Sequence, residues 1–101
     1  MPQGALPVRA AANISTTSVL NVTATTVVKA SPGTCYRASI VTYGTAAPAL
    51  YDVAVAANAA ASNEICTLGT TATQGTIAIE WPFFSGLVVN PNGGTICIAY
   101  S

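Results

Sequence analysis

Hydrophobic and polar positions alternate in short runs along most of this chain. Ile77, Ile79 and Trp81 share one face of such a run, and Ala78 and Glu80 lie on its other face. Successive side chains of a strand point to opposite faces of its sheet, so a period of two residues is typical of a half-buried β-strand. The pattern therefore predicts a chain built mainly from strands.

The same alternation, bounded by turn residues, recurs along the chain. The runs predicted as strands are 25–29, 34–43, 48–55, 65–68, 75–81, 87–89 and 95–100. Strands at regular spacing without amphipathic helices between them are typical of antiparallel sandwiches and barrels. We expect an all-β fold, a single antiparallel β-sandwich that is jelly-roll-like or barrel-like, with six to eight short strands.

Two of the predicted strands have clear faces. In 34–43, Tyr36, Ala38 and Ile40 fall on one face, and Cys35 falls on the other together with Arg37, Ser39 and Val41. In 95–100 the apolar face carries Ile96, Ile98 and Tyr100. The faces predict which side chains enter the core.

Turn residues predict how the strands are connected. Pro32-Gly33 suits a type II turn, and Asn92-Gly93 is the signal of a tight hairpin between the last two strands. Pro82 is expected to end the strand before it. The alanine-rich segment 54–62 is expected to be a loop with at most one helical turn, and 69–74 a polar turn.

The first 22 residues differ from the rest, because Pro2, Gly4 and Pro7 precede a stretch without a clear period. We interpret 1–22 as an extended N-terminal arm, which can end in a first strand, and 23–101 as the sandwich domain. A solvated tail is the simpler alternative. The apolar residues of the arm favour packing on a neighbouring subunit; Leu6, Val8, Arg9 and Ile14 are candidate interface residues.

Charge is scarce in this chain. Of 101 residues, 51% are hydrophobic, three are Lys or Arg, three are Asp or Glu, and none is histidine. A Ser-His-Asp triad, a Cys-His pair and a histidine metal site are therefore excluded. Three basic residues cannot form the positive stripe that nucleic acid requires. A nearly neutral, apolar surface instead favours a protein that packs against other copies or a partner.

Neither a signal peptide nor a membrane span is expected. The first twenty residues lack the basic region followed by an apolar block that a signal peptide has. Polar residues interrupt every uncharged run before it reaches the roughly 20 apolar residues that a transmembrane helix needs. We expect the chain to be made and kept in the cytosol, at least initially.

Cys35, Cys66 and Cys97 lack metal-ligand spacing. We expect buried, reduced thiols, with a disulfide between two of them as the alternative under oxidising conditions. The sequence spacing brings no two carboxylates together, and nucleophile and phosphate-binding motifs are absent. No catalytic residue, metal site or cofactor is predicted.

The densest aromatic cluster is Trp81, Phe83 and Phe84. It is either a platform for a carbohydrate or another ligand, or core packing at a strand end. Arg37 and Glu80 are predicted on the polar faces of two strands, where they could pair across neighbouring strands or across a subunit boundary. These five residues complete the candidate interface.

Several segments together resemble a known family. They are 25–34 (TTVVKASPGT), 39–42 (SIVT), 50–52 (LYD), 84–89 (FSGLVV) and the closing strand 95–100. Over residues 23–101 the chain is similar to small β-sandwich structural proteins of tailed bacteriophages, such as capsid cement (decoration) proteins. The resemblance implies a homo-oligomer, for example a trimer, on the outer capsid at junctions between major capsid protein subunits, without catalytic residues.

The resemblance therefore implies a non-enzymatic virion protein that stabilises the capsid shell and is assembled in the host cytoplasm. The predicted partners are the major capsid protein and other copies of the chain, with neither nucleic acid nor membrane. One alternative is another small virion component in the neck, tail or head fibre. The other is a carbohydrate- or ligand-binding β-sandwich module.

Overall fold

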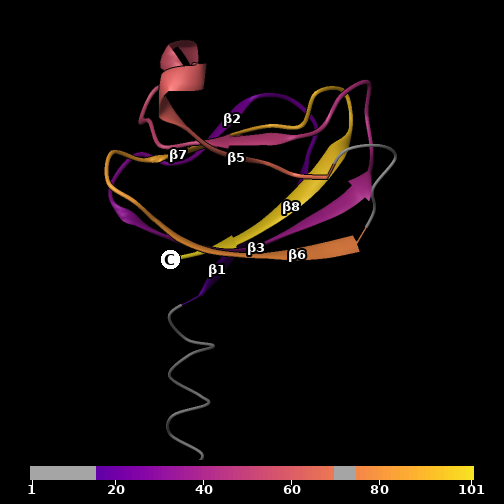
Figure 1. Cartoon of the computed structure of the whole chain (residues 1–101). Helices are drawn as coiled ribbons and strands as arrows, with labels where there is room; N and C mark the ends of the chain where they lie inside the picture. Colours follow the sequence, from indigo (N-terminus) through magenta and orange to yellow (C-terminus); the bar gives the residue numbers. More distant parts are fainter. Residues whose placement is uncertain (1–15, 70–74) are drawn as a thin grey trace, which may run out of the picture.

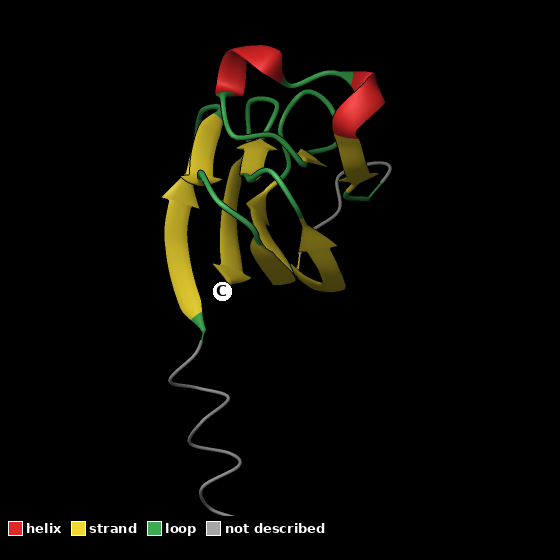
Figure 2. Ribbon diagram, turned by 90° about the vertical axis from the view of Figure 1, so that its left-hand side faces the viewer, coloured by secondary structure: helices red, strands yellow, loops and turns green. Residues whose placement is uncertain are grey.

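The alternating runs of the sequence form eight strands and two short 3-10 helices (Figures 1 and 2). The computed structural model describes residues 16–69 and 75–101. The elements are β1 (Thr17–Val22), β2 (Thr26–Lys29), β3 (Gly33–Thr42), β4 (Ala49–Tyr51), η1 (Ala56–Asn58), η2 (Ala61–Asn63), β5 (Glu64–Thr67), β6 (Gly75–Phe83), β7 (Leu87–Asn90) and β8 (Thr95–Tyr100).

The strands form two antiparallel four-stranded sheets that pack face to face. We call the sheet with the order β1-β8-β3-β6 the first sheet and the sheet with the order β2-β7-β4-β5 the second sheet. Along the chain, β1 pairs with β8, β2 with β7, β3 with β6 and β4 with β5. This nested pairing is a long antiparallel ribbon rolled into two sheets, which is a jelly roll. The predicted all-β sandwich is confirmed, in its jelly-roll form.

The core lies between the two sheets and receives side chains from both. In β8, Ile96 and Ile98 are buried while Cys97 between them is half-buried, as the alternation predicts. The buried cluster consists of Val22, Cys35, Ala38, Ile40, Leu50, Leu68, Phe83, Leu87, Val89, Ile96 and Ile98. Since this cluster draws on most strands of both sheets, the two layers fold as one unit.

One predicted face is wrong, and a β-bulge is the reason. The alternation places Cys35 opposite Ala38, but both are fully buried in the core. The register shifts here, because Cys35 lies opposite Tyr100 whereas Arg37 lies opposite Ala99. One extra residue in β3 resets the alternation, so Cys35 and Ala38 point to the same side.

The proline at position 82 does not end its strand, contrary to the prediction. β6 runs through Pro82 to Phe83, and Pro82 pairs with Thr34. β6 is an edge strand of the first sheet. An edge strand tolerates proline, since it pairs with a neighbour on one side only.

The two predicted turns also differ from the structure. Asn92 and Gly93 have positive φ angles of 50° and 87°, and the N–H of Gly94 donates to the carbonyl of Pro91 at 3.0 Å. The tight turn is therefore present, but β7 and β8 belong to different sheets, so the turn is not a hairpin. Gly33 begins β3 and lacks the positive φ that a type II turn requires.

The N-terminal boundary of the sandwich lies earlier than the one predicted after residue 22. Thr17–Val22 is β1 and pairs with β8 at the edge of the first sheet. Residues 1–15 of the predicted arm (1–22) and most of the predicted turn at 69–74 lie outside the described residues. The alanine-rich segment forms two 3-10 turns where at most one is predicted, and Asn63 bridges them: its side-chain N–H donates to the carbonyl of Asn58.

Candidate interaction surfaces

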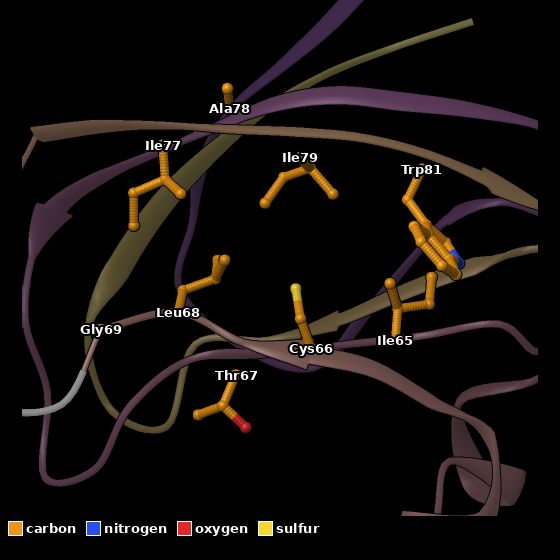
Figure 3. Close-up of a pocket in the computed structure, with 9 residues that line it drawn as sticks. All are labelled: Ile65, Cys66, Thr67, Leu68, Gly69, Ile77, Ala78, Ile79 and Trp81. Carbon is orange, nitrogen blue, oxygen red and sulfur yellow. The ribbon is translucent and has the colours of Figure 1, made fainter.

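A groove runs between the two edge strands on one side of the sandwich, β5 of the second sheet and β6 of the first (Figure 3). We call it the edge groove. Ile77, Ile79 and Trp81 point into it from β6, while Ala78 points away. The volume is about 370 Å³, and the lining residues are Ile65, Cys66, Thr67, Leu68, Gly69, Ile77, Ala78, Ile79 and Trp81.

The edge groove is apolar and carries no charged side chain in its lining. Trp81 is 55% exposed there, which is unusual for the largest apolar side chain. The hydroxyl-bearing Thr67 points away from the groove (Figure 3). Burial, followed by the nearby negative charge of Glu64, raises the pKa of the Cys66 thiol. The thiol is therefore neutral at neutral pH, and the groove suits an apolar occupant.

A second candidate surface is the solvent-facing side of the first sheet, which we call the outer sheet face. A shallow hollow of about 180 Å³ lies on it, lined by Ser18, Leu20, Arg37, Ser39, Thr76, Cys97, Ile98 and Ala99. Most of these side chains are small, and Arg37 is the one charged member. The face therefore carries little charge, and its Leu20 side chain is 67% exposed.

The opposite side of the sandwich is covered differently. η1 and η2 lie on the outer side of the second sheet (Figure 1). In β7, Leu87 and Val89 belong to the core cluster, whereas Val88 between them does not. Val88 is nevertheless fully buried. Because Val88 is buried by covering residues, the outer sheet face of the first sheet is the more open of the two.

Asp52 holds the corner between β6 and β7. Its carboxylate accepts backbone N–H bonds from Phe84 at 3.0 Å, Ser85 at 2.8 Å and Gly86 at 3.4 Å. Partial burial by itself would raise the pKa of Asp52, but these three N–H donors outweigh it and hold the pKa below its usual value. The carboxylate is thus a structural clamp, and its lowered pKa makes it a weak base near neutral pH.

The clamped corner presents an aromatic ring to solvent. Phe84 is 74% exposed, the largest exposed fraction among the large hydrophobic residues of the described chain. The turn packs closely against the sandwich beneath it, because a Cβ atom at Gly86 would meet the carbonyl oxygens of Lys29 and Val53 at 2.7 and 2.8 Å. An exposed aromatic side chain on a hydrogen-bonded turn is the kind of residue that can anchor a protein interface.

The structure separates the predicted aromatic cluster. Phe83 is buried in the core, Trp81 lines the edge groove and Phe84 lies on the clamped corner. The three do not form one platform, because the chain turns at the end of β6. Of the two interpretations of the aromatic cluster, core packing is therefore correct for Phe83 alone.

The predicted charged pair lies on neighbouring strands, with both side chains exposed. Within residues 16–69 and 75–101, no ion pair joins Arg37 and Glu80. Glu80 has a positive φ of 49° at the irregular part of β6, where the register with β3 shifts. The remaining candidate interface residues, Leu6, Val8, Arg9 and Ile14, lie outside the described residues.

The three cysteines are free thiols in different surroundings. Burial, together with the charge of nearby Cys66, raises the pKa of Cys35 to about 12. Cys66 lines the edge groove and Cys97 the outer hollow, both half-buried. The expectation of a buried thiol therefore holds fully only for Cys35. No described set of three or more His, Cys, Asp or Glu side chains is arranged to hold a metal ion.

Sequence reasoning missed the β5 side of the edge groove. The sequence predicts Ile65, Cys66 and Leu68 as an ordinary short strand, and no signal in it places them opposite β6. None of the helices in the described part of the chain is long and apolar enough to span a membrane. Comparisons with protein-family models, curated proteins and solved structures find no match for the chain.

Proposed function

We propose that this chain is a non-enzymatic structural protein of a virus particle, a cement protein that binds the outer capsid shell. The observation that carries the proposal is the outer sheet face, which is open, shallowly hollowed and nearly neutral. Such a surface can be buried against a partner without removing many charges from water, a step that is costly unless each charge is paired. The sequence resemblance to phage cement proteins supports the same role.

The size of the face favours several copies acting together. Four strands about 4.8 Å apart and about six residues long cover roughly 400 Å². A stable interface buries about 800 Å² on each partner. One outer sheet face therefore supplies about half of that area, and Phe84 at the clamped corner adds an anchor. A homo-oligomer such as a trimer would multiply the contact through avidity.

The test uses capsids from which the protein has been deleted, with purified chain added back. Ala99→Arg places a charge on the outer sheet face, and Ala57→Arg places the same charge on η1, away from that face. We expect wild type and Ala57→Arg to co-sediment with capsids and raise their resistance to heat, and Ala99→Arg to bind at least tenfold more weakly. Equal binding of all three proteins, or capsids that survive heating equally without the chain, would contradict the proposal.

Copy number separates the cement role from a neck, tail or fibre role, since a shell protein occurs in hundreds of copies per particle. The carbohydrate-binding alternative rests on the exposed ring of Trp81. Sugar recognition needs several hydrogen-bonding groups around an aromatic face, and the lining of the edge groove is mostly aliphatic. Glycan titration followed by Trp81 fluorescence tests this alternative, and an unchanged spectrum counts against it.

A further inference from the structure

The two strands that border the edge groove have open edges. β6 pairs with β3 on one side, and β5 pairs with β4 on one side. Among residues 16–69 and 75–101, no strand covers the other side of either one. The positive φ of Glu80 and the missing N–H of Pro82 interrupt one end of β6. In the regular part, from Gly75 to Ile79, the backbone groups that face away from β3 pair with no other described strand, and they lie beside an apolar groove.

Such an edge is a template for pairing with another strand. Added strands bind through backbone hydrogen bonds, and alternate side chains fill the pockets beside the edge. The occupant therefore has to be extended, with apolar residues at every second position. It also has to be nearly neutral on the buried side, because the groove offers no charged partner.

The N-terminal segment of the chain has this pattern. Between residues 6 and 15 the even positions are all apolar: Leu6, Val8, Ala10, Ala12 and Ile14. The odd positions include the charged Arg9 and the polar Asn13 and Ser15. The alternation is incomplete, because Pro7 and Ala11 at odd positions are also apolar. An apolar side chain at every second position is nevertheless what a row of pockets beside a strand edge can accept, and within the described sandwich β1 begins only at Thr17.

We propose that the N-terminal segment of a second copy, residues 6–14, adds as a strand to the free edge of β6 and places its even-numbered side chains in the edge groove. Arg9, at an odd position, then points to solvent and keeps its charge hydrated. This self-association goes beyond the capsid role and does not depend on it.

The chain's own segment cannot supply the whole pattern. Thr17, Tyr100, Cys35 and Trp81 lie in one row across the first sheet, since each pairs with the next. Three strand spacings separate Thr17 from Trp81 by about 14 Å. Ile14 lies three residues before Thr17 and reaches at most about 10 Å. The apolar residue nearest to the sandwich therefore cannot enter its own groove, whereas a second copy can align all of residues 6–14.

When each chain donates its strand to the next copy and accepts one from another, the contact is head-to-tail. Such a contact produces a ring when its rotation closes. A closed ring leaves no β6 edge open, which removes the aggregation hazard of a long unpaired strand.

Cross-linking tests the proposal with the native Cys66 in the groove as a probe. In full-length chain carrying Cys97→Ser, single cysteines are introduced at each position from 6 to 14 and oxidised with copper phenanthroline. We expect covalent dimers several-fold more often from even positions such as Val8→Cys than from odd positions such as Arg9→Cys, and their loss with Cys66→Ser. Equal yields at even and odd positions would overturn the proposal, and so would a Val8→Cys variant whose new thiol bonds to Cys66 only within monomers.

Sedimentation of the full chain gives an independent test. Wild type is expected as an oligomer, and the double variant Leu6→Asp, Val8→Asp as a monomer near 10.1 kDa. Ala11→Asp, Asn13→Asp is the matched control, because it adds the same charge on the other face of the strand and should remain oligomeric. A monomeric wild type at about 100 μM, or equal dissociation of both double variants, would refute the arm exchange.

Discussion

Removing the Asp52 carboxylate should loosen the corner that carries Phe84. Asp52→Ala leaves the N–H groups of Phe84, Ser85 and Gly86 without their acceptor, while Asp52→Asn keeps one acceptor oxygen but removes the charge. Neither change touches the core cluster. The effect on stability therefore measures the clamp itself.

The magnitude follows from the hydrogen bonds. Bonds to a charged group contribute about 1.5–3 kcal/mol each in favourable cases. The bonds from Phe84 and Ser85 are short, the one from Gly86 is long at 3.4 Å, and the site is half-exposed. We expect Asp52→Ala to lower the free energy of unfolding by about 2–3 kcal/mol and Asp52→Asn by about 1 kcal/mol. For a domain of this size, 2 kcal/mol corresponds to a decrease in Tm of roughly 10 °C.

The effect should depend on pH with a definite sign. The pKa of Asp52 is lower in the folded protein than its ordinary value of 3.8. A lowered folded-state pKa stabilises the fold above the unfolded pKa, and that stabilisation is lost as the pH falls through the folded pKa. The difference between wild type and Asp52→Asn should therefore be full at pH 6–7 and should shrink below about pH 4.

Urea unfolding followed by far-UV circular dichroism, at one protein concentration, measures these differences. Glu64→Gln is the matched control, because the Glu64 carboxylate accepts one exposed hydrogen bond from the Thr67 hydroxyl and should change stability by less than about 0.5 kcal/mol. If Asp52→Ala is as stable as wild type within that margin, or if the Asp52→Asn difference is unchanged at pH 3, the clamp is not what holds the corner.

Three further predictions concern single positions. Gly33→Ala should lower stability by about 1–3 kcal/mol in urea unfolding, because the new methyl group meets the carbonyl oxygen of Ser101. Cys35 has a pKa raised to about 12 from 9.0, so wild type should lose stability relative to Cys35→Ala as the pH rises from 9 toward 12; parallel curves would refute this. In the native protein at pH 8, Ellman's reagent should modify at most Cys66 and Cys97, and Cys35 only after unfolding. A third rapidly reacting native thiol would contradict the burial of Cys35.

The candidate surfaces show how far sequence reasoning reached. The alternation of Ile77, Ile79 and Trp81 correctly put these side chains on one face. It could not show that this face opens into a groove, because the groove also needs β5, and sequence gives no measure of which strands become edges. The clamp at Asp52 was likewise invisible, since its partners lie more than thirty residues away along the chain.

The sequence by itself determined the all-β class, the approximate strands and the scarcity of charge, because strand periodicity and composition are local properties. It misplaced Cys35, since a bulge resets the alternation through pairing with β8. It also joined β7 and β8 as a hairpin, although the Asn92-Gly93 turn crosses between sheets. Only tertiary structure decided these points. The four nested strand pairs, from β1 with β8 on the outside to β4 with β5 on the inside, depend on contacts between residues that are distant in the sequence. That pairing also decided which weakly charged faces are exposed.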